Sequence, residues 1–135
     1  MMLGDDAVSA VFRFLNANKD TLNIGDGNRV FKYERPQTFD SGCYIVVNFL
    51  PFVYSDVICE GAVNINVHVP KTATNEPNGK RLSKMSRQIA EWFREGLYLD
   101  GAYYELYSDS RPTLDNDDTY YVNLKLNVTY NNLKQ

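Results

Sequence analysis

The sequence predicts one α+β domain, built from a mostly antiparallel β-sheet with two helices packed on one face. Three observations predict it. Two segments carry apolar residues at the helical spacing of three and four, several segments alternate apolar and polar residues as strands do, and the strands follow one another in runs. The length of 135 residues and the hydrophobic and charged fractions of 44% and 23% suit a single globular domain.

The two helices are predicted near the N-terminus and in the middle of the chain. Asp5 or Asp6 is expected to cap the first helix, because a carboxylate accepts hydrogen bonds from the free N–H groups of a first turn. This helix should fade over residues 18–20. The second helix is expected over Leu82–Leu97, with Gly96 near its end. The apolar stripes consist of Val8, Val11, Phe12 and Leu15 in the first helix, and of Leu82, Met85, Ile89, Trp92, Phe93 and Leu97 in the second.

Three strands are predicted before the second helix and two after it. Pro36 is expected to end the first strand, and Pro51 to interrupt the second. The segment Phe52–Glu60 is expected to be an apolar connection. The strands are predicted at Val30–Arg35, Cys43–Leu50, Val63–Val69, Ala102–Ser110 and Tyr120–Tyr130, and the turn and loops at Gly25–Asn28, Gln37–Gly42, Lys71–Gly79 and Arg111–Thr119.

One face of the predicted sheet is unusually rich in asparagine. Its side chains include Asn64, Asn66, Asn123 and Asn127, although asparagine is disfavoured in strands. One interpretation is a solvent-exposed polar face of unusual composition. The other is a hydrated contact with another subunit, in which neutral amides both donate and accept hydrogen bonds.

The apolar connection after Pro51 gives the strongest indication of an interaction. Phe52, Tyr54 and Val57 either fold back onto the core or are buried against a partner, because large exposed apolar patches are rare in monomers. The sequence slightly favours the partner, since two strands already fill the core nearby. Phe52 and Tyr54 are therefore expected to contact a neighbouring subunit.

Two charged clusters stand out. The second helix opens with basic residues, where cations oppose the helix dipole, and the last loop is acidic. Both clusters suit a solvated surface. Alternatively, the basic residues contact an acidic partner, such as the acidic loop of a neighbouring copy, or DNA in a channel. The residues are Lys80, Arg81, Lys84 and Arg87 in the helix, and Asp115, Asp117 and Asp118 in the loop.

No catalytic, cofactor or metal site is predicted. The single histidine, His68, falls on the polar face of a strand, without a recognisable nucleophile and acid around it. Cys43 and Cys59 lack the CxxC spacing of zinc sites and of redox motifs. In an EF-hand loop starting at Asp115, Tyr120 and Leu126 would replace the required glycine and glutamate.

The charge and hydropathy of the chain limit the classes of partner that we expect it to bind. The net charge of −3 and the isoelectric point near 5.1 give no basic footprint for specific nucleic-acid binding. The longest apolar run, residues 43–54, is too short to span a bilayer. The first residues do not form a signal peptide, so we expect a cytoplasmic protein with both cysteines reduced.

The predicted order of helix, three strands, helix and two strands resembles that of phage tail terminator proteins, also called tail completion or head–tail joining proteins. The resemblance covers most of the chain and rests on element order rather than on an invariant motif. Its parts are the N-terminal helix, the strand Val30–Pro36, the hairpin Cys43–Val69, the helix Leu82–Leu97 and the strand pair Ala102–Tyr130 with Arg111-Pro112 at its turn.

The resemblance implies a structural virion protein that assembles in the host bacterial cytoplasm. Members of this family form a ring, usually of six copies, which caps the tail tube and faces the head-completion proteins. The implied partners are thus other copies, the tail tube protein and a head-completion protein, and no catalytic residue, metal or cofactor is implied. The alternatives are another head–tail connector or minor tail protein, a protein-interaction module outside phages, or a small cysteine hydrolase.

Overall fold

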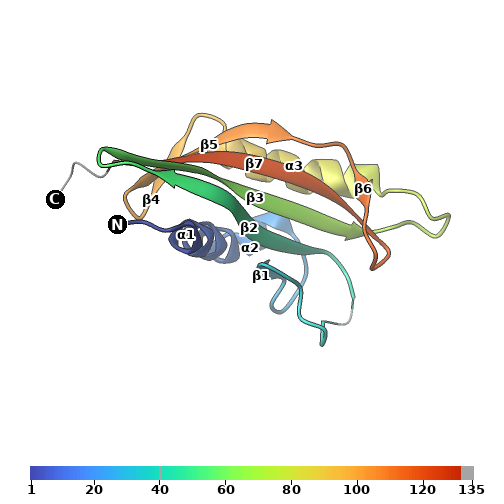
Figure 1. The fold of residues 1–135 in the computed structure, drawn as a ribbon. Coiled ribbons are helices and arrows are strands. Elements are labelled where there is room, and N and C mark those ends of the chain that lie inside the picture. The colour runs from blue at the N-terminus through green and yellow to red at the C-terminus, as the bar shows by residue number, and fades with distance from the viewer. Residues whose placement is uncertain (40, 132–135) are drawn as a thin grey trace.

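The computed structural model describes residues 1–39 and 41–131 and confirms the predicted α+β class. Within these residues the chain forms three helices and a seven-stranded sheet of order β1-β2-β3-β7-β5-β4, with β6 paired to β7 (Figure 1). The helices are α1 (Gly4–Ala17), α2 (Lys19–Leu22) and α3 (Gly79–Phe93). The strands are β1 (Val30–Lys32), β2 (Tyr44–Tyr54), β3 (Ile58–Pro70), β4 (Leu97–Leu99), β5 (Ala102–Asp109), β6 (Thr113–Leu114) and β7 (Thr119–Asn131).

The sheet is antiparallel except at one edge. β3 and β7 form its centre and pair along their whole lengths, from Ile58 opposite Asn131 to Pro70 opposite Thr119. β2 pairs antiparallel with β3, and β5 with β7, whereas the short β1 lies parallel to β2. The structure adds α2, β4 and β6 to the predicted element order.

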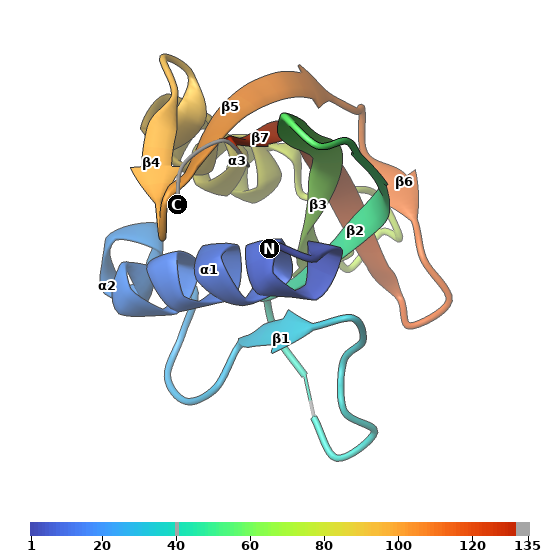
Figure 2. The same cartoon turned by 60° about the vertical axis from the view of Figure 1, so that its left-hand side comes forward.

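The two long helices cover the same face of the sheet, as predicted. In β3 the alternate residues Val63, Ile65 and Val67 are fully buried, and they belong to one core with the apolar stripes of α1 and α3. Figure 2 shows the sheet curling around these helices. The helices meet through Phe14, whose ring lies edge-on to the rings of Trp92 and Phe93 at centroid distances of 5.4 and 5.5 Å.

The start of α1 differs from the prediction. The helix begins at Gly4, so neither Asp5 nor Asp6 occupies the capping position, which is Leu3. The Asp6 carboxylate instead reaches back from the first turn and accepts a hydrogen bond from the Leu3 N–H at 2.9 Å. The early start lets the helix approach β2 closely, because a Cβ atom at Gly4 would collide with the ring of Phe49.

β1 is shorter than predicted, and Pro36 does not end it. Tyr33 has a φ of 70°, a left-handed conformation that stops the strand immediately after Lys32. Of the loop predicted over residues 37–42, Asp40 lies outside the described residues.

The prediction that Pro51 interrupts the second strand, with a connection over Phe52–Glu60, is wrong. β2 continues to Tyr54 and β3 begins at Ile58, so only a short turn separates them. β1 covers β2 only at residues 45–47, which leaves Pro51 on an uncovered edge where its missing N–H breaks no ladder bond. The register shifts between Leu50 and Val53, and this irregularity accommodates the proline.

The second predicted helix also ends earlier. α3 is capped by the Asn78 side chain, which accepts a hydrogen bond from the Arg81 N–H at 3.2 Å. Gly96, at a φ of 91°, turns the chain so that Leu97 belongs to β4 rather than to the helix. The predicted acidic loop contains the two-residue strand β6. In the described part of the chain, no helix combines the length and hydropathy needed to cross a membrane.

Candidate functional site

The asparagines of the face opposite the helices form a connected ladder. In the register, Asn66 lies opposite Asn123, and Asn64 lies opposite both Asn48 and Lys125. Asn123 donates to the amide oxygens of Asn66 and Asn64 at 2.8 and 3.2 Å, and Asn64 donates to Asn48 at 2.9 Å. The amides therefore satisfy one another in part, which fixes their orientation and leaves a partly exposed polar surface. We call this surface the amide face.

Asn127 lies apart from this ladder. It faces Ala62 across the β3–β7 pair, beside a hollow of about 410 Å³ that Leu50, Pro51 and Val53 also line. The amide face thus continues into an apolar region at the tip of the β2–β3 hairpin.

His68 closes the amide face at its other end and is buried. Its exposed fraction is 5%, because its ring stacks on Tyr44 at a centroid distance of 4.3 Å and on Tyr121 at 5.1 Å. Its Nδ1 lies 3.0 Å from the Thr119 hydroxyl oxygen. Burial lowers the pKa of His68 below its usual value, although the nearby Asp117 and Asp115 oppose this effect.

Asp117 connects three segments beside His68. It accepts hydrogen bonds from the hydroxyl of Tyr44 and, at 2.6 Å, from that of Thr119, and its Oδ2 lies 3.4 Å from the Arg35 Nε. Burial alone would raise the pKa of Asp117, but the hydrogen bonds from Thr119 and Tyr44 outweigh it and lower the pKa. Burial and the Asp117 carboxylate together raise the pKa of Tyr44. The carboxylate therefore stays ionised and joins the β6–β7 loop to β2 and to the loop after β1.

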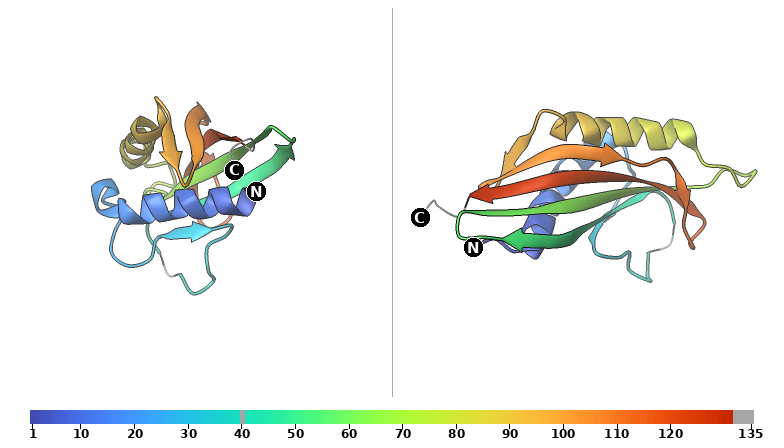
Figure 3. Two further views of the ribbon diagram at one scale, coloured as in Figure 1. Left: turned by 90° about the vertical axis from the view of Figure 1, so that its left-hand side faces the viewer. Right: turned by 45° about the horizontal axis from the view of Figure 1, so that its top comes forward.

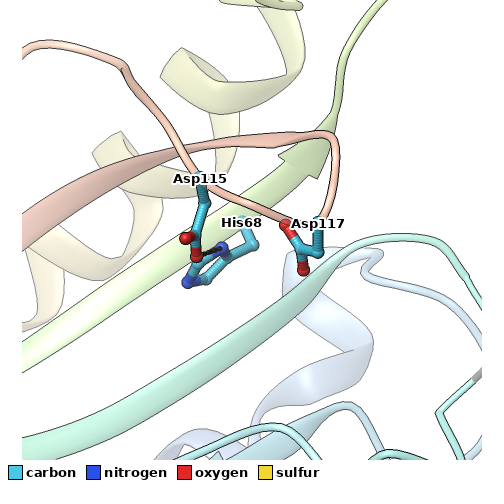
Figure 4. A group of neighbouring side chains, drawn as sticks. All are labelled: His68, Asp115 and Asp117. Atoms are coloured by element: carbon cyan, nitrogen blue, oxygen red, sulfur yellow. Dashed lines mark ion pairs between the residues drawn. The ribbon is translucent and has the colours of Figure 1, made fainter.

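Among the described residues, His68, Asp115 and Asp117 form a group whose ligand atoms could hold a metal ion (Figure 4). Their ligand atoms lie within 4.8 Å of one another, beside a cleft of about 330 Å³. Both oxygens of Asp117 already accept hydrogen bonds, and the Arg35 guanidinium balances its charge. The Thr119 hydroxyl donates its hydrogen bond to Asp117, so its oxygen acts as the acceptor toward His68. The Nδ1 atom of His68 is therefore protonated and donates to Thr119. The cluster therefore fits a polar network that holds segments of the fold together better than it fits a metal centre.

The β2–β3 hairpin ends in an apolar tip that the other described residues leave largely exposed. We call the segment Leu50–Val57 the hairpin arm. Val53 is 72% exposed, Val57 51% and Tyr54 40%. Phe52 differs, because it folds back toward the helix side, half-buried against Gly61, where any side chain would collide with its ring. Tyr54 and Val57 are thus exposed as a partner contact requires, whereas Phe52 partly serves the fold.

The charged clusters have partners within the chain. Arg81 donates to the Asn23 carbonyl oxygen at 2.6 Å, and Arg87 donates to the Ser83 hydroxyl at 3.1 Å. Asp118 pairs with Lys71 at 3.2 Å. Lys80, Lys84 and Asp115 keep exposed or half-exposed side chains. The structure therefore gives Arg81 and Asp117 structural roles, and the predicted role of the clusters in partner contact remains a prediction.

A groove between α3 and β5 is a feature that the sequence did not indicate. It has a volume of about 470 Å³ and is lined mainly by apolar side chains from α3, β5 and β7, among them Leu82, Ala90, Leu106, Pro112, Val122 and Leu124. The right-hand view of Figure 3 shows α3 running beside β5 along this edge of the sheet. The pairing of β5 with β7 shifts register between Leu106 and Ser108, and Leu106 lines the groove. No local sequence pattern predicts such a shift.

The two cysteines are separate and buried. Cys43 and Cys59 are free thiols, and burial raises the pKa of the Cys59 thiol above its usual value. A raised pKa keeps a thiol protonated and lowers its reactivity as a nucleophile.

No protein-family model matches the chain, and no curated protein matches it significantly.

Proposed function

We propose that this protein is a structural component of a phage or prophage neck, similar to the tail terminators, which forms an oligomeric ring on the tail tube and joins it to the head. The observation that carries the proposal is the hairpin arm, whose side chains Val53, Tyr54 and Val57 are left exposed by the described residues. The expected copy number of six comes from the resemblance to the family.

The arm needs a partner for a physical reason. Burying apolar surface is favourable by roughly 25 cal/mol per Å², and exposed apolar side chains on a protruding strand pair also invite aggregation. Val53, Tyr54 and Val57 lie together at one end of the sheet rather than scattered over the surface. Such a concentrated apolar tip is typical of an interface anchor.

The polar groups favour binding over catalysis. The cysteines, which are the candidate nucleophiles of a hydrolase, are buried, and the Cys59 thiol has a raised pKa. His68 lies between two aromatic rings and bonds Thr119 rather than a nucleophile. The partly exposed amide face offers donors and acceptors to a partner over an area with fixed geometry.

Electron microscopy and light scattering test the proposal. The chain is purified alone and with the tube protein encoded beside it, and rings are expected on their own or at the ends of tubes. The matched control is the Val53→Asp, Val57→Asp variant, which should stay folded and leave tube ends bare. A chain that remains strictly monomeric, both alone and with the tube protein, would contradict the proposal. Binding to capsid-side proteins alone would favour a head-closure protein.

A further inference from the structure

We infer that the hairpin arm of one copy docks into the groove between α3 and β5 of the next copy. This inference rests on the proposed ring function and specifies the contact that would build the ring. Among the described residues, the arm exposes apolar side chains, and the groove is an open hollow with apolar side chains in its lining.

The positions of the two surfaces favour contact between copies. The arm extends β2 and β3 at one end of the sheet, beside the N-terminus, whereas the groove lies along the β5 edge toward β6 (Figure 1). A chain cannot fill its own groove with its own arm across the sheet. Two different surfaces that complement each other give a head-to-tail contact, and such contacts generate closed rings when the rotation per copy allows it.

One pair of opposite charges is available between the two surfaces, Asp56 on the arm and Arg87 in the groove, while the exposed Asp109 lines another part of the groove. Asp56 is the one charged residue between Asn48 and Cys59, and its side chain is exposed in the turn of the arm. In the described part of the chain Asp56 has no ion-pair partner. Arg87 lines the groove, is exposed, and contacts only the neutral Ser83 hydroxyl among the polar contacts described. An arm in the groove can place Asp56 against Arg87 while Val53 and Val57 cover the apolar lining.

The groove also has open polar groups along its sides. β4 pairs with β5 only at residues 102–104, so within the described residues the outer edge of β5 from Glu105 to Asp109 has no strand beside it. The Ser86 hydroxyl, at the groove, is covered and lacks a hydrogen-bond partner among the described residues. A docked segment supplies backbone groups to this edge, as in the binding of peptides to sheet edges.

Pro51 fits this mode of docking. The outer edge of β2 beyond Val47 is uncovered, and proline on such an edge prevents a continuous strand ladder with another edge. The arm is thus suited to insertion into a groove through its tip rather than to pairing along its whole side.

A charge exchange tests the inference by sedimentation velocity. Asp56→Arg and Arg87→Glu are each expected to weaken self-association about tenfold or more, because each places like charges together. The double variant Asp56→Arg, Arg87→Glu should restore association, since the pair is then reversed. Asp26→Arg, an equal charge change at an exposed turn elsewhere, is the control and should associate normally. Single variants that associate like the wild type, or a double variant that is not restored, would overturn the inference.

Cross-linking gives a second readout that does not depend on the charges. Copies carrying Val53→Cys are mixed with copies carrying Ser83→Cys at the groove, and a short bismaleimide is added. A cross-linked pair is expected, whereas Lys84→Cys, on a different side of α3, should give little. Equal yields at both positions, or no product, would contradict arm docking. Rings that persist with the tube protein despite these results would leave the proposed function standing and reject only this contact.

Discussion

The two ends of the β2–β3 hairpin are built from the same pair of strands but are stabilised in opposite ways. At one end, Tyr44 and His68 stack face to face and the Asp117 carboxylate binds the Tyr44 hydroxyl, so the chain covers its own side chains. At the other end, Val53 and Val57 are exposed. The first end is covered by the chain's own side chains, and the second exposes apolar side chains that we propose another chain covers.

This contrast separates residues that maintain the fold from residues available for assembly. Changes at the His68 end should lower the stability of the single chain, because buried polar groups would lose their partners. Changes at the arm should leave that stability nearly intact and act on association. The amide face lies between the two ends, and hydrogen bonds between its neutral amides hold it in place.

Among substitutions at the two ends of the hairpin, the largest expected effect on stability comes from Asp117→Ala. The substitution leaves the Tyr44 and Thr119 hydroxyls without their acceptor and Arg35 without its counter-ion, and we expect a loss of about 2 kcal/mol in the free energy of unfolding. Urea denaturation followed by tyrosine fluorescence measures it. The control is Asp118→Asn, which removes an exposed ion pair and should cost less than about 0.5 kcal/mol. Equal losses in both variants would show that the Asp117 cluster does not stabilise this end.

A fall in pH is expected to have a smaller effect on the free energy of unfolding. Because the pKa of folded His68 is lowered, the unfolded chain takes up a proton first as the pH falls below about 6.5, and stability declines until the lower folded pKa is reached. The pKa of Asp117 is also lowered, so its contribution is present above the usual value of 3.8 and is lost as the pH falls through the folded pKa. Urea midpoints between pH 8 and 3 should show two declines.

The variant His68→Phe isolates the first decline. Phenylalanine keeps an aromatic ring between Tyr44 and Tyr121 and cannot be protonated, so the decline beginning near pH 6.5 should disappear while the acid one remains. A wild-type midpoint that is constant from pH 8 to 5 would contradict the lowered histidine pKa.

The sequence predicted the faces of the sheet well because strand alternation is a local property. Val63, Ile65 and Val67 face the helices and Asn64 and Asn66 face away, as a period of two requires. Pro51 was mispredicted because the effect of a proline depends on whether its position faces a paired strand, and that is decided by where β1 stops.

The cluster around Asp117 could not be predicted from local patterns. Arg35, Tyr44, His68 and Asp117 come from four separate segments, and only the closure of the β6–β7 loop over the end of β3 brings them together. Alternation placed His68 on the polar face correctly, but its burial depends on Tyr44 and Tyr121 lying opposite it in the register.

The smallest expected effect on the single chain comes from Val53→Ser combined with Val57→Ser. Both side chains are mainly exposed, so their replacement removes little buried apolar surface and should change the unfolding free energy by less than about 0.5 kcal/mol. The same variant should lose association, which sedimentation velocity at matched concentrations measures. The matched control is Val63→Ser in the core, where the loss of a fully buried side chain should destabilise the chain strongly. A Val53→Ser, Val57→Ser variant that is as unstable as Val63→Ser would mean that the arm belongs to the fold and not to an interface.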